Sequence, residues 1–200
     1  QTVNKMEKKN NRGKKLQRKT CAHLRGNFRL YDEEGPLKLY SEPNDKGQKG
    51  AVFVRNKNVM KCFPRVKCVN VSEKDKDINL PDVTKTLFFD NHEGCLIRVY
   101  FANNDWRIST QRKIDAFKSR WSSQKSFGML FVEAFTAEYN RNENFKNTIE
   151  KSVLPKNATL LSKFFNVLDK SKQYLFILLH DEHNRVVCES PPEPTMFHVG

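Results

Sequence analysis

Alternating apolar and polar residues mark the strongest predicted strands, which lie in the middle of the chain. Residues 95–101 and 106–110 show this alternation, and Asn103-Asn104-Asp105 between them is typical of a turn. Because successive side chains of a strand point to opposite faces, the pattern favours strands with one buried face. The two segments therefore predict a hairpin.

Shorter segments of the same kind predict further strands before and after this hairpin. These segments are residues 23–31, 37–40, 51–55, 58–63, 83–89, 174–179, 185–188 and 196–199. Residues 51–55 and 58–63 are separated only by Asn56-Lys57, which predicts a second hairpin. Residues 174–179 and 185–188 flank a polar turn and predict a third. Residues 32–36 predict a turn.

Apolar residues three and four positions apart predict helices in the second half of the chain. Residues 112–139 predict one long helix or two, with a break at 121–123, and we expect their aromatic stripe to be core rather than a surface for base stacking. Residues 145–153 predict a short helix, and Thr159 predicts the N-cap of a helix over 160–168. The pattern as a whole predicts an α+β fold, with mainly antiparallel sheets and helices packed on one side.

Charge changes the interpretation of the first twenty residues. The 200-residue chain carries a formal net charge of +13, which favours a polyanionic partner. Residues 1–20 are basic and contain almost nothing apolar, so burial cannot offset the entropy of ordering them. We expect a mobile basic arm that orders on nucleic acid; a solvated tail or a nuclear-import signal is the alternative. The basic residues expected to contact nucleic acid are Lys8, Lys9, Arg12, Lys14, Lys15, Arg18 and Lys19 of the arm, with Lys118 and Arg120 of the domain.

Cysteine usage and hydropathy suggest where the protein works. The five cysteines have no CxxC spacing, which favours free thiols in a reducing compartment and predicts no metal site. His180 and His183 flank acids in a turn, where a solvated turn is favoured over a divalent metal. No apolar run approaches the about 20 residues of a membrane span. We therefore expect a cytosolic or nuclear protein and no membrane partner.

Four segments, in the same order and spacing, resemble a known enzyme family. They are Leu24-Arg25-Gly26-Asn27-Phe28, Phe63-Pro64-Arg65-Val66-Lys67-Cys68-Val69-Asn70, the pair Glu93-Gly94-Cys95-Leu96-Ile97-Arg98-Val99-Tyr100 and Trp106-Arg107-Ile108-Ser109-Thr110, and Asn184-Arg185-Val186-Val187. Together they resemble the nucleotidyltransferase domain of the phage T4 RNA ligase 1 type, within the covalent ligase and capping-enzyme superfamily. The resemblance implies a ligase-type, ATP-grasp-like core over residues 21–200 that continues beyond residue 200.

The family's reaction begins when a lysine ε-amine attacks the α-phosphate of ATP, giving a covalent lysine–AMP. The resemblance puts Asn91 at the position of this lysine and Leu178 at that of a glutamate that helps to bind the ribose or a metal. A carboxamide nitrogen shares its lone pair with the carbonyl group and cannot replace the amine. The resemblance therefore implies a fold that has lost covalent catalysis.

The resemblance and the basic residues after the hairpin also imply a nucleotide-binding region. The Glu93-Gly94 corner lies beside a strand and faces the basic run 112–120, where a phosphate could be held. The positions implied for nucleotide binding are Arg25, Asn91, Glu93, Gly94, Arg98, Lys113 and Arg185.

Three hypotheses follow. The favoured one is a degenerate ligase-like module that binds nucleic acid, RNA rather than DNA, or assembles with viral proteins; it implies no particular cofactor. The sequences that it resembles are ligase-like proteins of large DNA viruses, so a cytoplasmic viral factory or the virion is the expected location. The second hypothesis is an active RNA ligase that uses ATP, Mg²⁺ and a displaced nucleophile such as Lys113. The third is a structural component of a virion or complex.

Overall fold

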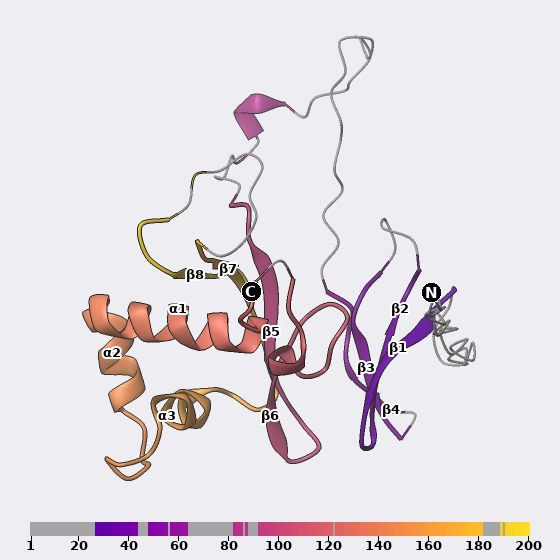
Figure 1. Ribbon diagram of the computed structural model, residues 1–200, viewed down its shortest axis with the longest axis horizontal. Helices are drawn as coiled ribbons and strands as arrows, with labels where there is room; N and C mark the ends of the chain where they lie inside the picture. Colours follow the sequence, from indigo (N-terminus) through magenta and orange to yellow (C-terminus); the bar gives the residue numbers. More distant parts are fainter. Residues whose placement is uncertain are drawn as a thin grey trace, which may run out of the picture.

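The computed structural model describes the chain in several stretches. These are residues 27–43, 48–55, 57–63, 82–85, 87, 92–121, 123–181, 189 and 191–200. In this part of the chain, two antiparallel sheets and three α-helices are arranged in layers (Figure 1). This arrangement confirms the predicted α+β class with mainly antiparallel strands. The basic arm (1–20), Arg25, Asn91 and Arg185 lie outside the described residues.

The first sheet is a meander of four strands. They are β1 (Arg29–Glu34), β2 (Leu37–Ser41), β3 (Ala51–Val54) and β4 (Lys57–Met60), each antiparallel to the next. The strand at 37–40 and the hairpin around residue 56 are confirmed. The predicted turn at 32–36 is too long, because β1 continues to Glu34 and the chain turns at Gly35, whose φ of +56° suits glycine.

The second sheet has the strand order β6-β5-β7-β8. Its strands are β5 (Cys95–Ala102), β6 (Asp105–Ser109), β7 (Gln173–Leu179) and β8 (Thr195–His198). The central hairpin is confirmed: β5 and β6 pair across Asn103 and Asn104, both with positive φ, as a tight hairpin turn requires. The expected hairpin partner of β7, residues 185–188, lies outside the described residues; β7 pairs with β5 and β8.

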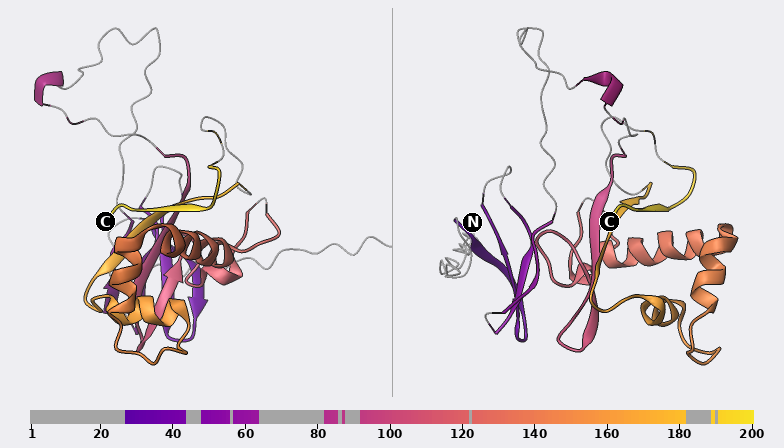
Figure 2. Two further views of the ribbon diagram at one scale, coloured as in Figure 1. Left: turned by 90° about the vertical axis from the view of Figure 1, so that its left-hand side faces the viewer. Right: turned by 180° about the vertical axis from the view of Figure 1, so that it is seen from behind.

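Three helices lie on one side of the second sheet, as Figures 1 and 2 show. They are α1 (Phe127–Arg141), α2 (Glu143–Glu150) and α3 (Leu160–Val167). Each begins at a polar N-cap whose side chain accepts a backbone N–H bond: Ser126, Asn142 and Thr159. The predicted Thr159 cap and the predicted side for the helices are confirmed.

Two predicted elements are wrong. The expected helix from residue 112 does not form; the chain makes only the 3₁₀ helix η2 (Ala116–Lys118) before α1 begins at Phe127. The backbone is extended at Asp115 and at Ser119, which bound η2, so the helix does not extend in either direction. Asp32 accepts from Ile114 N and holds the chain before η2 in a turn. The strand expected at 83–89 begins instead as the 3₁₀ helix η1 (Val83–Lys85).

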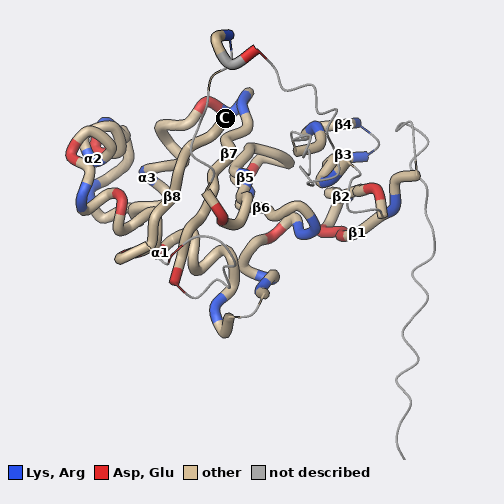
Figure 3. Tube along the Cα trace, turned by 90° about the horizontal axis from the view of Figure 1, so that it is seen from above, with Lys and Arg blue, Asp and Glu red and all other residues tan. Residues whose placement is uncertain are grey.

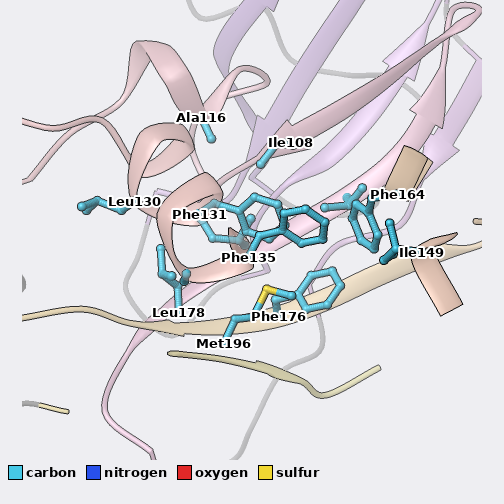
Figure 4. Close-up of a cluster of buried hydrophobic side chains, with 13 residues drawn as sticks. Ile108, Ala116, Leu130, Phe131, Phe135, Ile149, Phe164, Phe176, Leu178 and Met196 are labelled. Atoms are coloured by element: carbon cyan, nitrogen blue, oxygen red, sulfur yellow. The ribbon is translucent and has the colours of Figure 1, made fainter. Parts of the chain in front are cut away.

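The second sheet lies between the helices and the first sheet, and β5 has buried side chains on both faces. Ile97 and Val99 pack with the helices, whereas Tyr100 and Ala102 pack against the first sheet. Aromatic side chains of α1, α3 and β7 fill the helix side (Figure 4). Those labelled in the figure are Phe131, Phe135, Phe164 and Phe176. The expectation that the aromatic stripe forms core is thus confirmed for Phe131 and Phe135.

Candidate functional site

A groove lies beside the first half of β5, because its neighbour β6 is shorter. Ser109, the last residue of β6, pairs with Arg98, so Cys95–Ile97 extend beyond it. The chain then leaves the sheet at Thr110, and the space beside β5 is a cavity of about 590 Å³. Its lining residues are Gly94, Cys95, Leu96, Ile97, Thr110, Gln111, Arg112, Ser119, Arg120, Trp121 and Phe127. A groove of this volume is within the range of small-ligand sites.

One wall of the groove is a tight turn over residues 110–114. Thr110 N donates to Lys113 O at 2.9 Å, and Thr110 Oγ1 accepts from Lys113 N at 3.1 Å. Asp32 and Ser41 of the first sheet hold this turn from outside, through Ile114 N and the Gln111 carbonyl group. These bonds keep the turn in place. Arg112 belongs to this turn, and its side chain is exposed.

The other wall is the loop from Ser119 to Phe127, which carries Arg120 and Trp121. Phe127 N donates to Ser119 O at 2.8 Å and closes the loop at the start of α1. Trp121 is 66% exposed. The expectation that this aromatic belongs to the core is therefore wrong, and it is wrong also for Phe117, which is 46% exposed.

The basic residues around this groove fall into two groups. Arg107 and Lys118 bind Glu34 at 2.9 and 3.1 Å, and Lys113 binds Asp32 at 2.9 Å. Figure 3 shows the resulting meeting of basic and acidic segments between β6 and β1. Within the stretches that the structure describes, the groove residues Arg112 and Arg120 make no ion pair; Arg112 lies 5.8 Å from the centre of the Tyr31 ring. Among the described residues, therefore, no ion pair offsets the positive charges of these two groove residues.

Of the predicted Glu93-Gly94 corner, Gly94 is a groove residue. Gly94 lines the groove together with Arg112 and Arg120. A Cβ atom at this position would lie 2.6 Å from Leu178 O, so only glycine fits. His92, just before the corner, stacks on Phe197 of β8 with ring centres 4.1 Å apart. Contacts with β7 and β8 thus fix the corner.

Arg98 is a different case, because its side chain is fully buried. Its guanidinium donates to Lys61 O and Gly50 O, both at 2.7 Å, and stacks over Phe63 and Tyr100. Burial lowers the pKa of Arg98 to about 10. The prediction that Arg98 contacts a nucleotide is corrected. Its guanidinium group forms hydrogen bonds between the two sheets, and its burial makes it inaccessible to a ligand in this structure.

Two further predicted residues also have internal contacts. Lys113, the proposed displaced nucleophile, has its ammonium group on Asp32 and does not line the groove. Leu178, where the resemblance implied the position of a glutamate, is fully buried in the core beside α1. Burial also raises the pKa of the Cys95 thiol to about 11, so this groove residue is not a thiolate at neutral pH.

Histidine and acidic side chains of the described residues do not form a metal site. Among these residues, no group of histidine, cysteine and acidic side chains could hold a metal ion. His180 contacts Glu133 and Asp181 instead, at 3.0 and 2.6 Å. No helix in the described stretches is long and apolar enough to cross a membrane.

Sequence reasoning missed two groove residues, Arg112 and Trp121. The basic run signalled the region, but charge alone could not tell which cations are neutralised by acids far away in the sequence. For Trp121, the three- and four-residue spacing pointed to a helix that does not form.

The chain is similar to iridovirus proteins. It is 29% identical over 163 residues to the immediate-early protein ICP-46 homolog of Invertebrate iridescent virus 6, covering 78% of this chain and 33% of that protein. It is 32% identical over 96 residues to the homolog of Invertebrate iridescent virus 3, covering 48% and 17%. It is 27% identical over 104 residues to immediate-early protein ICP-46 of Frog virus 3, covering 51% and 24%.

The chain thus spans a third or less of the length of these relatives. No protein-family model and no solved structure matches it. The relatives support the expectation of a viral protein.

Proposed function

We propose that this domain is a nucleic-acid-binding module and that the groove beside β5 holds the sugar–phosphate backbone, with RNA as the preferred partner. One observation carries the proposal: two arginines without ion pairs among the described residues, and an exposed tryptophan, line the same groove. No Asp or Glu is among the described residues that line it. The groove is therefore cationic with an aromatic surface.

The chemistry of these side chains matches a nucleic-acid strand. A guanidinium group presents a planar set of donors that fits two phosphate oxygens at once. An exposed indole ring can stack on a base, which is worth about 1–3 kcal/mol per base and tolerates any sequence. Arg112 and Trp121 both line the groove, so we expect a strand lying along β5 to contact both.

We infer further that the module derives from a ligase-like nucleotidyltransferase that has lost its reaction. Three features support this inference: Asn91 stands where the family has its lysine, Leu178 is buried at the glutamate position, and Lys113 is paired with Asp32. Incubation with labelled ATP and Mg²⁺, followed by denaturing electrophoresis, should leave the protein unlabelled. A covalent label that Lys113→Ala abolishes would establish the active ligase instead.

The binding proposal is tested with a labelled RNA of about 16 nucleotides, a length that covers one single-strand site. Anisotropy titrations should show that Arg112→Ala/Arg120→Ala weakens binding by about tenfold or more, since charge-assisted bonds are removed. The slope of log K against log salt should flatten by about 0.7 for each phosphate that is no longer neutralised.

The matched control is Arg141→Ala/Lys146→Ala, which removes the same charge from α1 and α2. Both residues already bind acids, Glu138 and Glu143, and neither lines the groove. This variant should bind RNA almost as the wild type does. If the two double variants lose affinity equally, the groove is not the binding site; matching DNA titrations establish the RNA preference.

A further inference from the structure

Asp32 is an acidic residue of β1 that holds a wall of the basic groove. Its side chain is only 17% exposed. One carboxylate oxygen accepts from Ile114 N at 2.9 Å, and the other accepts from Lys113 Nζ at 2.9 Å. Both donors belong to the turn over residues 110–114 that carries Arg112. One side chain of the first sheet therefore fixes the last part of this turn.

The neighbouring bonds make Asp32 the main outside support of the turn. The turn's own bonds join Thr110 to Arg112 and Lys113, and they close it without setting its direction. Among the described residues, one other side chain of the first sheet hydrogen-bonds to this turn, and that bond, from Ser41 Oγ to Gln111 O, is long at 3.3 Å. Tyr31 of β1 contacts the Arg112 side chain, with the guanidinium carbon 5.8 Å from the ring centre, but within the described stretches it forms no hydrogen bond with the turn backbone. A charged acceptor of a backbone N–H forms a shorter and stronger bond than a neutral one.

We propose that Asp32 is a positioning residue for nucleic-acid binding: its carboxylate sets the place of the 110–114 turn and so directs the Arg112 guanidinium into the groove. This inference rests on the proposed function of the groove. Asp32 itself does not line the groove, so we expect it to act through the turn and not by contact with the strand.

The proposal makes a prediction opposite in sign to that of simple electrostatics. Removing an acid from a basic surface lowers the repulsion of a polyanion, so binding ordinarily becomes tighter. Loss of Asp32 should instead weaken binding, because Arg112 loses its fixed position. The sign of the effect therefore separates positioning from charge.

The matched control is Glu33, the next residue along β1. Its side chain pairs with Lys38 at 3.7 Å and is about half exposed, and within the described stretches no hydrogen bond or ion pair joins it to the 110–114 turn. Glu33→Ala removes the same charge from the same strand, so it should leave RNA binding unchanged or slightly tighter. Asp32→Ala should weaken binding by about five- to tenfold, most of the effect of losing Arg112.

Two further variants distinguish positioning from a general loss of structure. Asp32→Asn keeps an oxygen acceptor for Ile114 N, so its affinity should lie between those of the wild type and Asp32→Ala. In the Arg112→Ala background, Asp32→Ala should have almost no further effect, since it acts through the arginine. Melting curves identify any variant that unfolds; if Asp32→Ala does, Asp32→Asn is compared with Glu33→Gln.

The outcomes separate the two proposals. If Asp32→Ala binds RNA as tightly as Glu33→Ala, or if its effect is equally large without Arg112, the positioning role is overturned. It is also overturned if folded Asp32→Asn binds no more weakly than Glu33→Gln in the substitute comparison. If Arg112→Ala/Arg120→Ala binds RNA like its charge-matched control, the proposed function itself fails, whatever Asp32 does.

Discussion

Arg98 carries its positive charge inside the protein without an acidic partner among the described residues. Backbone carbonyl groups of Gly50 and Lys61 accept from it, and two aromatic rings lie against its guanidinium plane. Gly50 and Lys61 flank β3 and β4 of the first sheet, whereas Arg98 belongs to β5. This single side chain thus connects the two sheets, and the partial negative charges of carbonyl oxygens offset part of its desolvation cost.

We expect Arg98→Ala to destabilise the fold by about 3 kcal/mol or more, because a buried and a partly buried carbonyl group lose their donor and two rings lose the guanidinium that packs on them. Urea unfolding followed by circular dichroism measures the change. Arg112→Ala, which removes the same side chain from the exposed turn, should stay within about 0.5 kcal/mol of the wild type. Equal unfolding midpoints for the two variants would contradict the structural role of Arg98.

The sequence could identify the basic run after the hairpin but not the fate of each cation. Lys113 and Asp32 are 81 residues apart, and Glu34 is 84 residues from Lys118. Only the packing of β1 against the 110–118 segment brings them together. For that reason, the sequence could not show that Lys113 and Lys118 are less available to a ligand than Arg112. Among the described basic residues, Arg112 and Arg120 line the groove.

At the level of elements, prediction succeeded where the local pattern and the tertiary contacts agree. The alternation in β5 and β6 is regular, and Asn103 and Asn104 readily adopt the positive φ that their turn requires. For helix α3, likewise, both the N-cap residue Thr159 and the apolar face could be recognised in the sequence. Residues 112–121 have helical spacing too, but they do not form the predicted helix. Ile114 N donates to Asp32, which is 82 residues away in the sequence, so a tertiary contact decides the local structure.

Helix α1 provides a prediction about packing. Phe135 is 1% exposed and contacts the rings of Phe145 and Phe164 at centre distances of 5.5 and 4.9 Å. Phe135→Ala should cost about 3–5 kcal/mol, since it leaves a cavity at the junction of the three helices. Thermal and urea unfolding both report this loss.

The control is Met129→Ala on the same helix, where the side chain is 48% exposed. It removes apolar atoms without opening a buried cavity, so the loss should be below about 1 kcal/mol. A similar loss for both variants would mean that the aromatic cluster is not the centre of this layer.

At the scale of the whole molecule, the sequence predicted the class of fold but not the order of its layers. Antiparallel strands and helices on one side followed from periodicity. The alternation predicted one buried face for β5, but Tyr100 and Ala102 on its other face are buried too, because the first sheet packs on them. The groove could not be predicted either. It exists because β6 ends opposite Arg98 and leaves the first residues of β5 without a neighbour from β6.

The net charge of +13 belongs to the whole molecule, and its distribution yields the last prediction. Residues 1–20 contain basic residues from Lys5 to Lys19 and one acid, Glu7, so they carry a large share of this charge. Each lysine that neutralises a phosphate releases a counterion. Deleting residues 1–20 should therefore weaken RNA binding and flatten its salt slope by about 0.7 for each phosphate that the arm had neutralised.

The deletion also shows whether arm and groove act on one strand. If both bind the same RNA, the decrease in slope on removing the arm and the decrease in Arg112→Ala/Arg120→Ala should add in the combined variant, because each neutralised phosphate contributes separately to the slope. Titrations at several salt concentrations between about 50 and 200 mM resolve such slopes. If the truncated and intact proteins bound RNA alike at every concentration, the arm would not be a binding element, and the groove alone would have to account for the affinity.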